Sequence, residues 1–122
     1  MFHLYFFLYY NRLYDDVYPK HKQTKSGKAR FKDASVNPIK TKEEGQKLLD
    51  SAIKVPGKTY LVQCYEKKVI IFRSSNDGYY HAYEEKQPVD FVPKEAWKQW
   101  KAEGLLTDKE IRKLKKQKVN KE

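Results

Sequence analysis

Apolar residues first recur at helical spacing in the stretch that follows Asn37-Pro38. Residues 41–44, "TKEE", have the T-x-x-E spacing of a capping box, which marks the start of a helix. The apolar positions that follow at helical intervals are Leu48, Leu49, Ala52 and Ile53. Because "VPG" at 55–57 would end a helix, the pattern predicts one over about residues 42–54.

The pattern then changes to strands. The segment "KTYLVQCYEKKVIIFRSSNDGYYHAYEE" contains three runs rich in β-branched and aromatic residues. Glu66-Lys67 and Asn76-Asp77-Gly78 separate these runs and have turn composition. We therefore expect a three-stranded antiparallel meander.

Two short helices are predicted after the strands. Pro93 suits the first turn of a helix, Trp97 and Trp100 share one face that we expect in the core, and Gly104 ends the helix. "TDKE" at 107–110 is a second capping-box pattern before apolar positions of a final helix. The expected fold is α+β: an N-terminal helix, the meander and two short C-terminal helices.

The first 36 residues differ in composition from the rest. "MFHLYFFLYY" is apolar over about ten residues, shorter than the roughly 18–20 that span a membrane, so we expect no membrane span. A strand, a packed helix or an interfacial membrane foothold would each suit it. Residues 19–34 carry five lysines, one arginine and one acid, which is typical of a linker or arm. We expect residues 1–36 to form an aromatic segment with a basic arm, and 37–122 a compact domain with a lysine-rich tail.

The excess of positive charge indicates which kinds of partner the protein binds. The chain has 26 Lys and Arg against 16 Asp and Glu, for a formal net charge of +10. Such an excess favours a polyanion as partner, with RNA first and an acidic protein second, although it is also compatible with a solvated lysine surface. The arm either contacts phosphates without specificity or is only a connector. Its candidate phosphate-binding residues are Lys20, Lys22, Lys25, Lys28 and Arg30.

Cysteine and histidine content limits the chemistry. A single cysteine, Cys64, permits no intramolecular disulfide and no zinc site built from cysteines, and we expect it to be a buried thiol. His3, His21 and His81 show no metal-ligand spacing. We therefore expect no metal and no cofactor.

The hairpin in "SSNDGYYHAY" decides which residue faces His81. A three-residue loop would place Arg73 opposite His81, on the face to which Tyr79 and Tyr83 also point. A two-residue loop would instead place Ser74 there and turn Arg73 away.

The first register brings together groups suited to RNA cleavage without a metal. That reaction needs a base, an acid and a cation for the phosphate. His81 is the candidate general acid or base, Arg73 the phosphate ligand, and Lys58 an assisting cation. Tyr79 and Tyr80 are candidates for stacking on unpaired bases. A hydrogen-bonded histidine in an ordinary strand is the structural alternative.

"DGYYHAY", followed by "VPKEAWKQWKAEGLLTDKEIRKLKK", resembles C-terminal toxin domains of bacterial polymorphic and contact-dependent toxin systems. The resemblance covers about residues 43–117. Tyr80, Ala82 and Glu84 stand where such domains often have tryptophan, glycine and proline. The resemblance implies a small basic ribonuclease with an acidic immunity protein as inhibitor, and it supports His81 and Tyr83 as site residues.

The sequence therefore predicts a small basic toxin-like domain that acts as a metal-independent endoribonuclease. The alternatives are a non-catalytic nucleic-acid-binding module and a protein-interaction or accessory protein with an acidic partner. Cytoplasmic location and delivery as part of a larger secreted toxin both agree with the composition.

Overall fold

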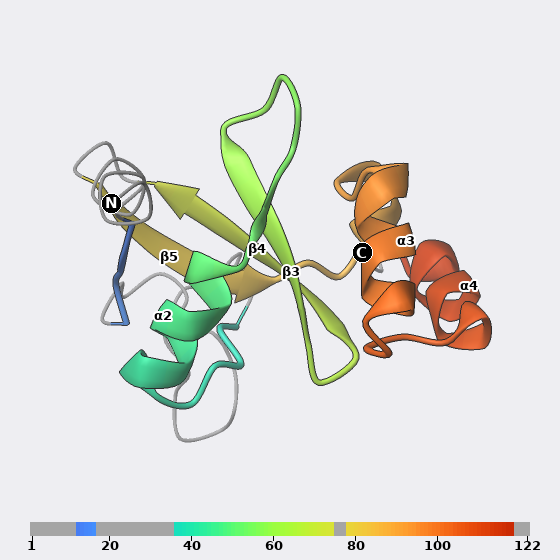
Figure 1. The fold of residues 1–122 in the computed structure, drawn as a ribbon, viewed down its shortest axis with the longest axis horizontal. Coiled ribbons are helices and arrows are strands. Elements are labelled where there is room, and N and C mark those ends of the chain that lie inside the picture. The colour runs from blue at the N-terminus through green and yellow to red at the C-terminus, as the bar shows by residue number, and fades with distance from the viewer. Residues whose placement is uncertain (1–11, 17–35, 75–77, 119–122) are drawn as a thin grey trace, which may run out of the picture.

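A five-stranded sheet organises the chain, as seen in a computed structural model that describes residues 12–16, 36–74 and 78–118 (Figure 1). The strands are β1 (Leu13–Tyr14), β2 (Ile53–Lys54), β3 (Tyr60–Tyr65), β4 (Lys68–Ser74) and β5 (Tyr79–Glu84). The helices are α2 (Lys42–Asp50), α3 (Lys94–Ala102) and α4 (Asp108–Lys116), with a short 3-10 helix, η2 (Pro88–Asp90). The fold is α+β, as the sequence predicts.

The strand order is β1-β5-β4-β3-β2, and its centre is the expected antiparallel meander of β3, β4 and β5. Two short strands extend this meander: β2 is antiparallel to β3, and β1 is parallel to β5. The sheet is therefore mixed and wider than predicted. No helix in the described part of the chain is long and apolar enough to cross a membrane.

The predicted end of the first helix, at about residue 54, was wrong. Helix α2 ends at Asp50 with Ser51 as its C-cap, and Ile53 then pairs with Val62 in the sheet. Ile53 fits the helical spacing, but its β-branched side chain suits a strand equally well, and pairing with β3 prevails. Thr41 caps α2 by accepting from the Glu44 backbone, while the Glu44 carboxylate accepts from the Tyr65 hydroxyl.

The N-terminal strand β1 is locked against α2. Tyr14 is 2% exposed, and its ring lies so close to Gly45 that a Cβ at that position would stand 2.1 Å from a ring carbon. Its backbone N–H donates to the Gln46 side chain at 2.9 Å, and its hydroxyl accepts from the Asn37 amide at 2.7 Å. Leu13 and Tyr14 thus belong to the sheet. Most of residues 1–36 lie outside the described residues, so the division of the chain at residue 36 stays a prediction.

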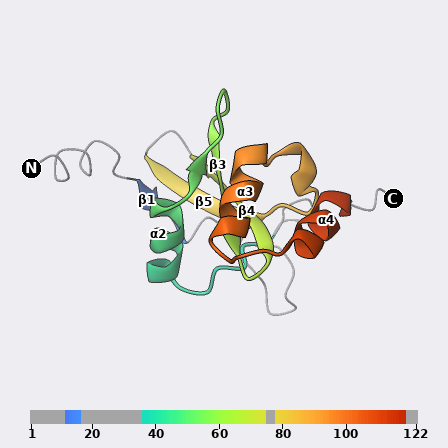
Figure 2. The same ribbon diagram turned by 45° about the vertical axis from the view of Figure 1, so that its right-hand side comes forward.

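Each face of the sheet carries its own core. On one face Leu49 of α2 and Tyr14 pack with Leu61, Ile70 and Phe72. The other core gathers strand residues beneath α3 and α4, including Val62, Val69, Ile71, Trp97 and Trp100. Figures 1 and 2 show α2 on one side of the strands and the α3–α4 pair on the other. Both tryptophans are buried, which confirms the prediction that they belong to the core.

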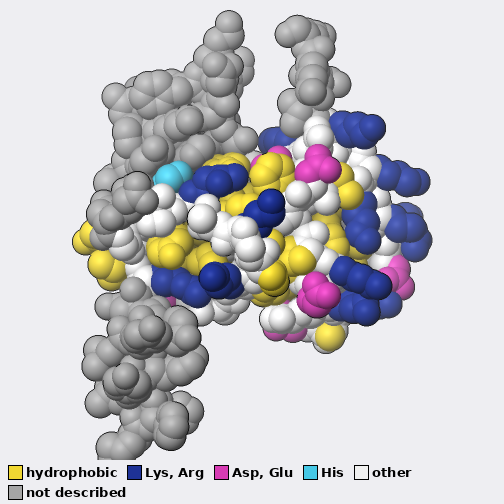
Figure 3. Space-filling view, turned by 90° about the horizontal axis from the view of Figure 1, so that it is seen from above, with side chains coloured by type: hydrophobic (Ala, Val, Ile, Leu, Met, Phe, Trp, Pro, Cys, Tyr) yellow, Lys and Arg dark blue, Asp and Glu magenta, His cyan; other side chains and the backbone are white. Residues whose placement is uncertain are grey.

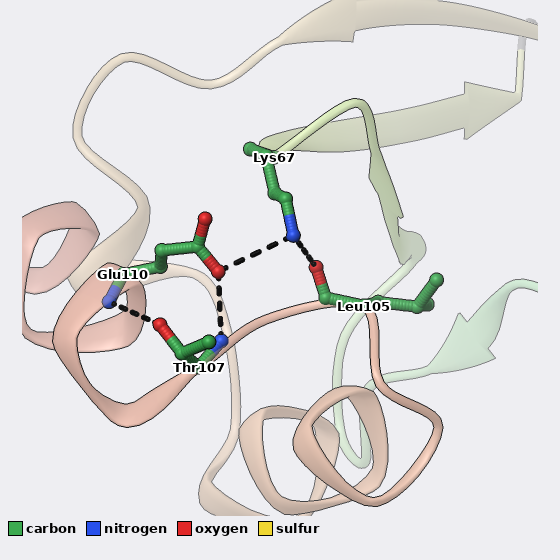
Figure 4. A network of polar contacts seen from close by, with 4 residues as sticks. All are labelled: Lys67, Leu105, Thr107 and Glu110. Atoms are coloured by element: carbon green, nitrogen blue, oxygen red, sulfur yellow. Dashed lines mark hydrogen bonds and ion pairs between the residues drawn. The ribbon is translucent and has the colours of Figure 1, made fainter.

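Helix α4 is attached to the sheet through a small polar network (Figure 4). Thr107 and Glu110 form the predicted capping box, with bonds of 3.2 and 2.8 Å. Lys67, in the tight turn between β3 and β4, donates to the Leu105 carbonyl and pairs with Glu110 at 3.3 Å. Glu66 and Lys67 both have positive φ, as a two-residue hairpin turn of type I′ requires. The network holds the turn and the helix together.

Candidate functional site

Three residues form a row across the middle strands near one end of the sheet: Tyr60 on β3, Arg73 on β4 and His81 on β5. Tyr60 pairs with Arg73, and Arg73 pairs with His81. We call these three residues the polar row. The pairing confirms the register expected for a three-residue loop, and the two-residue alternative, with Ser74 opposite His81, was wrong because Ser74 pairs with Tyr80.

The Arg73 guanidinium is held in place by two tyrosines. Its Nε–H donates to the Tyr83 hydroxyl at 2.9 Å, and its central carbon lies 5.2 Å from the centre of the Tyr60 ring, in a cation–π contact. The Tyr60 hydroxyl in turn donates to the Phe91 carbonyl at 2.8 Å. Burial raises the pKa of Tyr60, and the positive charge of Arg73 opposes that rise. The half-buried Arg73 is thus a fixed cation, and its guanidinium has further N–H groups of the kind that bind phosphate.

His81 is more enclosed than Arg73, with 8% of its surface exposed. It lies on the face of the sheet that, further along β4, carries the core residues Val69 and Ile71. At the position of Arg73 and His81 this face changes from apolar to polar. In Figure 3 a small histidine surface borders Lys and Arg side chains. A histidine so placed exposes little of its surface to solvent.

The two tyrosines proposed for base stacking lie on opposite faces. Tyr79 shares the face of His81, is 44% exposed and pairs with Leu13, which is 39% exposed. Tyr80 points to the other face, where it packs against the core that contains Phe72. Of this pair, Tyr79 is the one that the structure places beside the polar row.

The remaining candidate residues lie apart from the row or outside the description. Lys58 is exposed in the turn between β2 and β3, two residues before Tyr60. Its position lies at the end of the sheet where Arg73 stands. The basic-arm candidates Lys20, Lys22, Lys25, Lys28 and Arg30 lie outside the described residues.

Sequence reasoning missed two residues of this region. Tyr60 was assigned only to a strand, although its ring supports Arg73. Asp15 follows Tyr14 just as His81 follows Tyr80, and its backbone N–H donates to the Tyr80 carbonyl at 2.8 Å. An acidic residue therefore directly follows β1, the strand beside β5, at the position that corresponds to His81. The strand partner of Tyr60 could have been found by continuing the β3–β4 register, but the parallel pairing of β1 leaves no local sequence signal.

Cys64 takes no part in the polar row. It pairs with Val69 at the far end of the β3–β4 hairpin and is 5% exposed. Burial raises the pKa of its thiol to about 11, so the nucleophilic thiolate is scarce at neutral pH. Among residues 12–16, 36–74 and 78–118, no group of three or more His, Cys, Asp or Glu side chains is arranged to hold a metal ion.

Comparison with known proteins gives no relative for this chain. No family model, no curated protein and no solved structure matches it.

Proposed function

We propose that this protein binds RNA and cleaves it without a metal ion, with the polar row and Tyr83 as its reaction centre. The single observation that carries the proposal is the pairing of Arg73 with His81 on one face of the sheet. A titratable imidazole and a fixed cation are the two groups that cleavage at a phosphodiester needs most.

The chemistry begins with the RNA 2′-hydroxyl. A base removes its proton, the oxygen attacks phosphorus, and the bond to the 5′-oxygen breaks as an acid supplies a proton to the leaving group. His81 serves as the base or the acid, since the ordinary pKa of histidine lies nearest neutrality. Arg73 neutralises the developing phosphorane charge. Tyr83, which accepts the Arg73 hydrogen bond, lies on the same face and can donate the second proton.

Three further observations support RNA as the substrate. The net charge of +10 attracts a polyanion. Tyr79 is exposed on the face of the row, where its ring can stack on an unpaired base. The stretch from about 43 to 117 also resembles toxin domains that include small basic ribonucleases. By that resemblance, an acidic inhibitor protein is a further partner that we propose.

The test is cleavage of total RNA by the purified protein in excess EDTA. We expect cleavage by the parent protein, and a loss of about 100- to 10,000-fold in rate for His81→Asn, the range for loss of a general acid or base. Arg73→Ala should lower the rate by about 100- to 1,000-fold, the range for loss of one charge-stabilising donor.

Gln63→Ala is the matched control for these variants. Gln63 is the other buried polar residue of the sheet, at 5% exposed, and it bonds to Leu48 and Ser51 on the opposite face. We expect it to lower stability and leave the rate of cleavage per folded molecule unchanged. Equal rates for His81→Asn and the parent would refute the assignment of His81.

A second function is favoured by the burial of His81. At 8% exposed, this side chain offers little surface for proton exchange with a substrate, whereas Arg73 and Tyr79 can hold a phosphate and a base without any reaction. The protein would then be a non-catalytic RNA-binding module. In the EDTA assay it would bind RNA, with strong salt dependence, and the parent would show no cleavage.

A further inference from the structure

Helices α3 and α4 enclose a shallow groove of about 240 Å³ that is separate from the polar row. Its lining, which we call the lysine groove, consists of Lys94, Trp97, Lys98, Lys101, Asp108, Ile111 and Lys115. Trp97 is 5% and Ile111 8% exposed, so the apolar residues belong to the core. Four of the seven lining residues are lysines, three from α3 and one from α4.

The lysines of α3 form one stripe. Lys94, Lys98 and Lys101 are spaced at i, i+4 and i+7, which puts them on a single helix face. At about 1.5 Å of rise per residue, the stripe is roughly 10 Å long. A stripe of this length can contact more than one phosphate of the same RNA strand.

The opposite wall of the groove adds one lysine and one acid. Lys115 of α4 lies with its ammonium 5.7 Å from the centre of the Trp97 ring, which holds it over the groove. Asp108 pairs with Lys101 at 2.9 Å, but both side chains are more than half exposed, so this pair is weak and exchangeable. The groove keeps a clear positive excess. Figure 3 shows Lys and Arg side chains gathered at the end of the molecule formed by α3 and α4.

The groove suits a phosphate backbone better than a protein surface. Protein interfaces depend on exposed aromatic or aliphatic anchors at their centre and are poor in lysine. Here Trp97 and Ile111 are already buried, which leaves a partner little apolar surface to cover. Lysines are mobile point charges that follow a chain of phosphates without reading its sequence.

We propose that the lysine groove binds the sugar–phosphate backbone of a single RNA strand, as a second contact outside the reaction centre. The proposal rests on RNA binding as part of the proposed function and adds where the strand lies. Binding there is independent of base sequence and sensitive to salt. It holds the RNA on the protein whichever base occupies the polar row.

The test measures binding alone, with a fluorescent 12-nucleotide 2′-O-methyl RNA. Because this probe lacks a free 2′-hydroxyl, it cannot undergo the proposed cleavage, and affinity is measured whether or not the protein is a nuclease. The groove variant combines Lys94→Gln, Lys98→Gln and Lys115→Gln. Loss of three phosphate contacts should reduce the slope of log affinity against log salt by about 2, which amounts to about 100-fold at 0.1 M relative to 1 M salt.

The matched control removes the same charge elsewhere. Lys42, Lys47 and Lys54 are exposed on α2 and β2, outside the groove, and their triple change to glutamine should leave most of the slope intact. Thermal melting checks that both variants fold. Equal losses in the two variants would show that only net charge matters and overturn the proposal. Parent-like affinity in the groove variant would also overturn it and make an acidic protein the candidate occupant.

The two proposals can fail separately. If the parent does not cleave RNA but the groove variant alone loses affinity, the ribonuclease assignment fails and the groove assignment stands. If His81→Asn abolishes cleavage while the groove variant binds the probe as the parent does, the groove assignment fails alone.

Discussion

The two faces of the sheet follow the same alternation of side chains but end differently. On the face toward α2, apolar side chains continue from Ile70 to Phe72, and Tyr14 closes that end with an edge-to-face contact to Phe72 at 6.1 Å. On the face toward α3 and α4, the apolar series Val69 and Ile71 is followed by Arg73. The α2 face has its buried polar side chain, Gln63, in the middle of β3, where it bonds to Leu48 and Ser51. The other face becomes polar at its β4–β5 end, at Arg73 and His81.

This difference distinguishes residues whose presence packing explains from residues whose presence it does not explain. A buried face that is filled to its edge needs no explanation beyond packing. A half-buried arginine and a buried histidine in adjacent strands occupy positions where apolar residues would stabilise the sheet more simply. Arg73 and His81 are therefore better candidates for a functional site than the buried Cys64.

The largest contrast should come from two neighbouring residues of β4. Phe72→Ala removes a fully buried ring and should lower the free energy of unfolding by about 3–5 kcal/mol. Arg73→Ala should lower it by only about 1–2 kcal/mol, for one hydrogen bond and one cation–π contact, yet slow RNA cleavage by about 100- to 1,000-fold. Urea unfolding and the EDTA cleavage assay measure the two effects. Similar losses of stability for both variants would contradict the proposed difference between the two faces of the sheet.

The packing of Tyr14 in β1 against α2 depends on the absence of a side chain at Gly45. In an ordinary helix Gly→Ala is stabilising by up to about 1 kcal/mol, but here the added methyl group collides with the Tyr14 ring. We expect Gly45→Ala to destabilise the fold by about 1–3 kcal/mol through overpacking. Adding Tyr14→Leu should recover part of the loss, and a double-mutant cycle by urea unfolding measures the coupling. Stabilisation by Gly45→Ala alone would show that β1 is not packed on α2.

The attachment of α4 offers a smaller effect that depends on pH. Thr107→Ala removes the helix cap and should lower the free energy of unfolding by about 1 kcal/mol.

The hydrogen bond from the Thr107 backbone, with help from Lys67, holds the pKa of Glu110 below its usual value. Its contribution to stability is therefore present above about pH 4.5 and is lost as pH falls through the lowered pKa. Unfolding of the parent and of Glu110→Gln between pH 3 and 7 tests this, and identical pH profiles would contradict it.

A further pH-dependent effect is expected at alkaline pH. Burial raises the pKa of the Cys64 thiol from 9.0 to about 11. Its contribution to stability is complete below pH 9 and is lost as pH rises through about 11, because the unfolded chain releases the proton first. Cys64→Val should remove this part of the alkaline decline, and what remains should come from Tyr14, Tyr60 and Tyr65, whose pKa values burial also raises. Thermal unfolding from pH 7 to 10.5 measures the difference.

Local patterns predicted most of the fold. The capping motifs at Thr41 and Thr107 each act within a few residues, so the helices and the meander could be derived from the sequence. The pairing of Arg73 with His81 was one of two registers that the sequence left open. The pairing of the edge strands of the sheet could not be derived in this way. Leu13 pairs with Tyr79 across more than sixty residues, and such pairing depends on packing that no short pattern records.

The candidate site was predictable to the same degree. Alternation along β4 and β5 placed Arg73, His81, Tyr79 and Tyr83 on one face once the loop length was chosen. The burial of His81 was not predictable, because strand alternation gives the face on which a side chain lies and not how much of it is covered. The contact between the Tyr60 ring and Arg73 was not predictable from the β4–β5 hairpin either, because it depends on the register of a third strand, β3.

The most direct test of the central claim is the chemical nature of the RNA ends produced in EDTA. If the polar row catalyses attack by the 2′-hydroxyl, the fragments made by the parent protein carry 2′,3′-cyclic phosphates, and a 2′-O-methyl RNA is not cut. Fragments that end in 3′-hydroxyls, or cutting of the 2′-O-methyl RNA, would contradict that mechanism. RNA left intact by the parent would contradict the claim that this face of the sheet is catalytic.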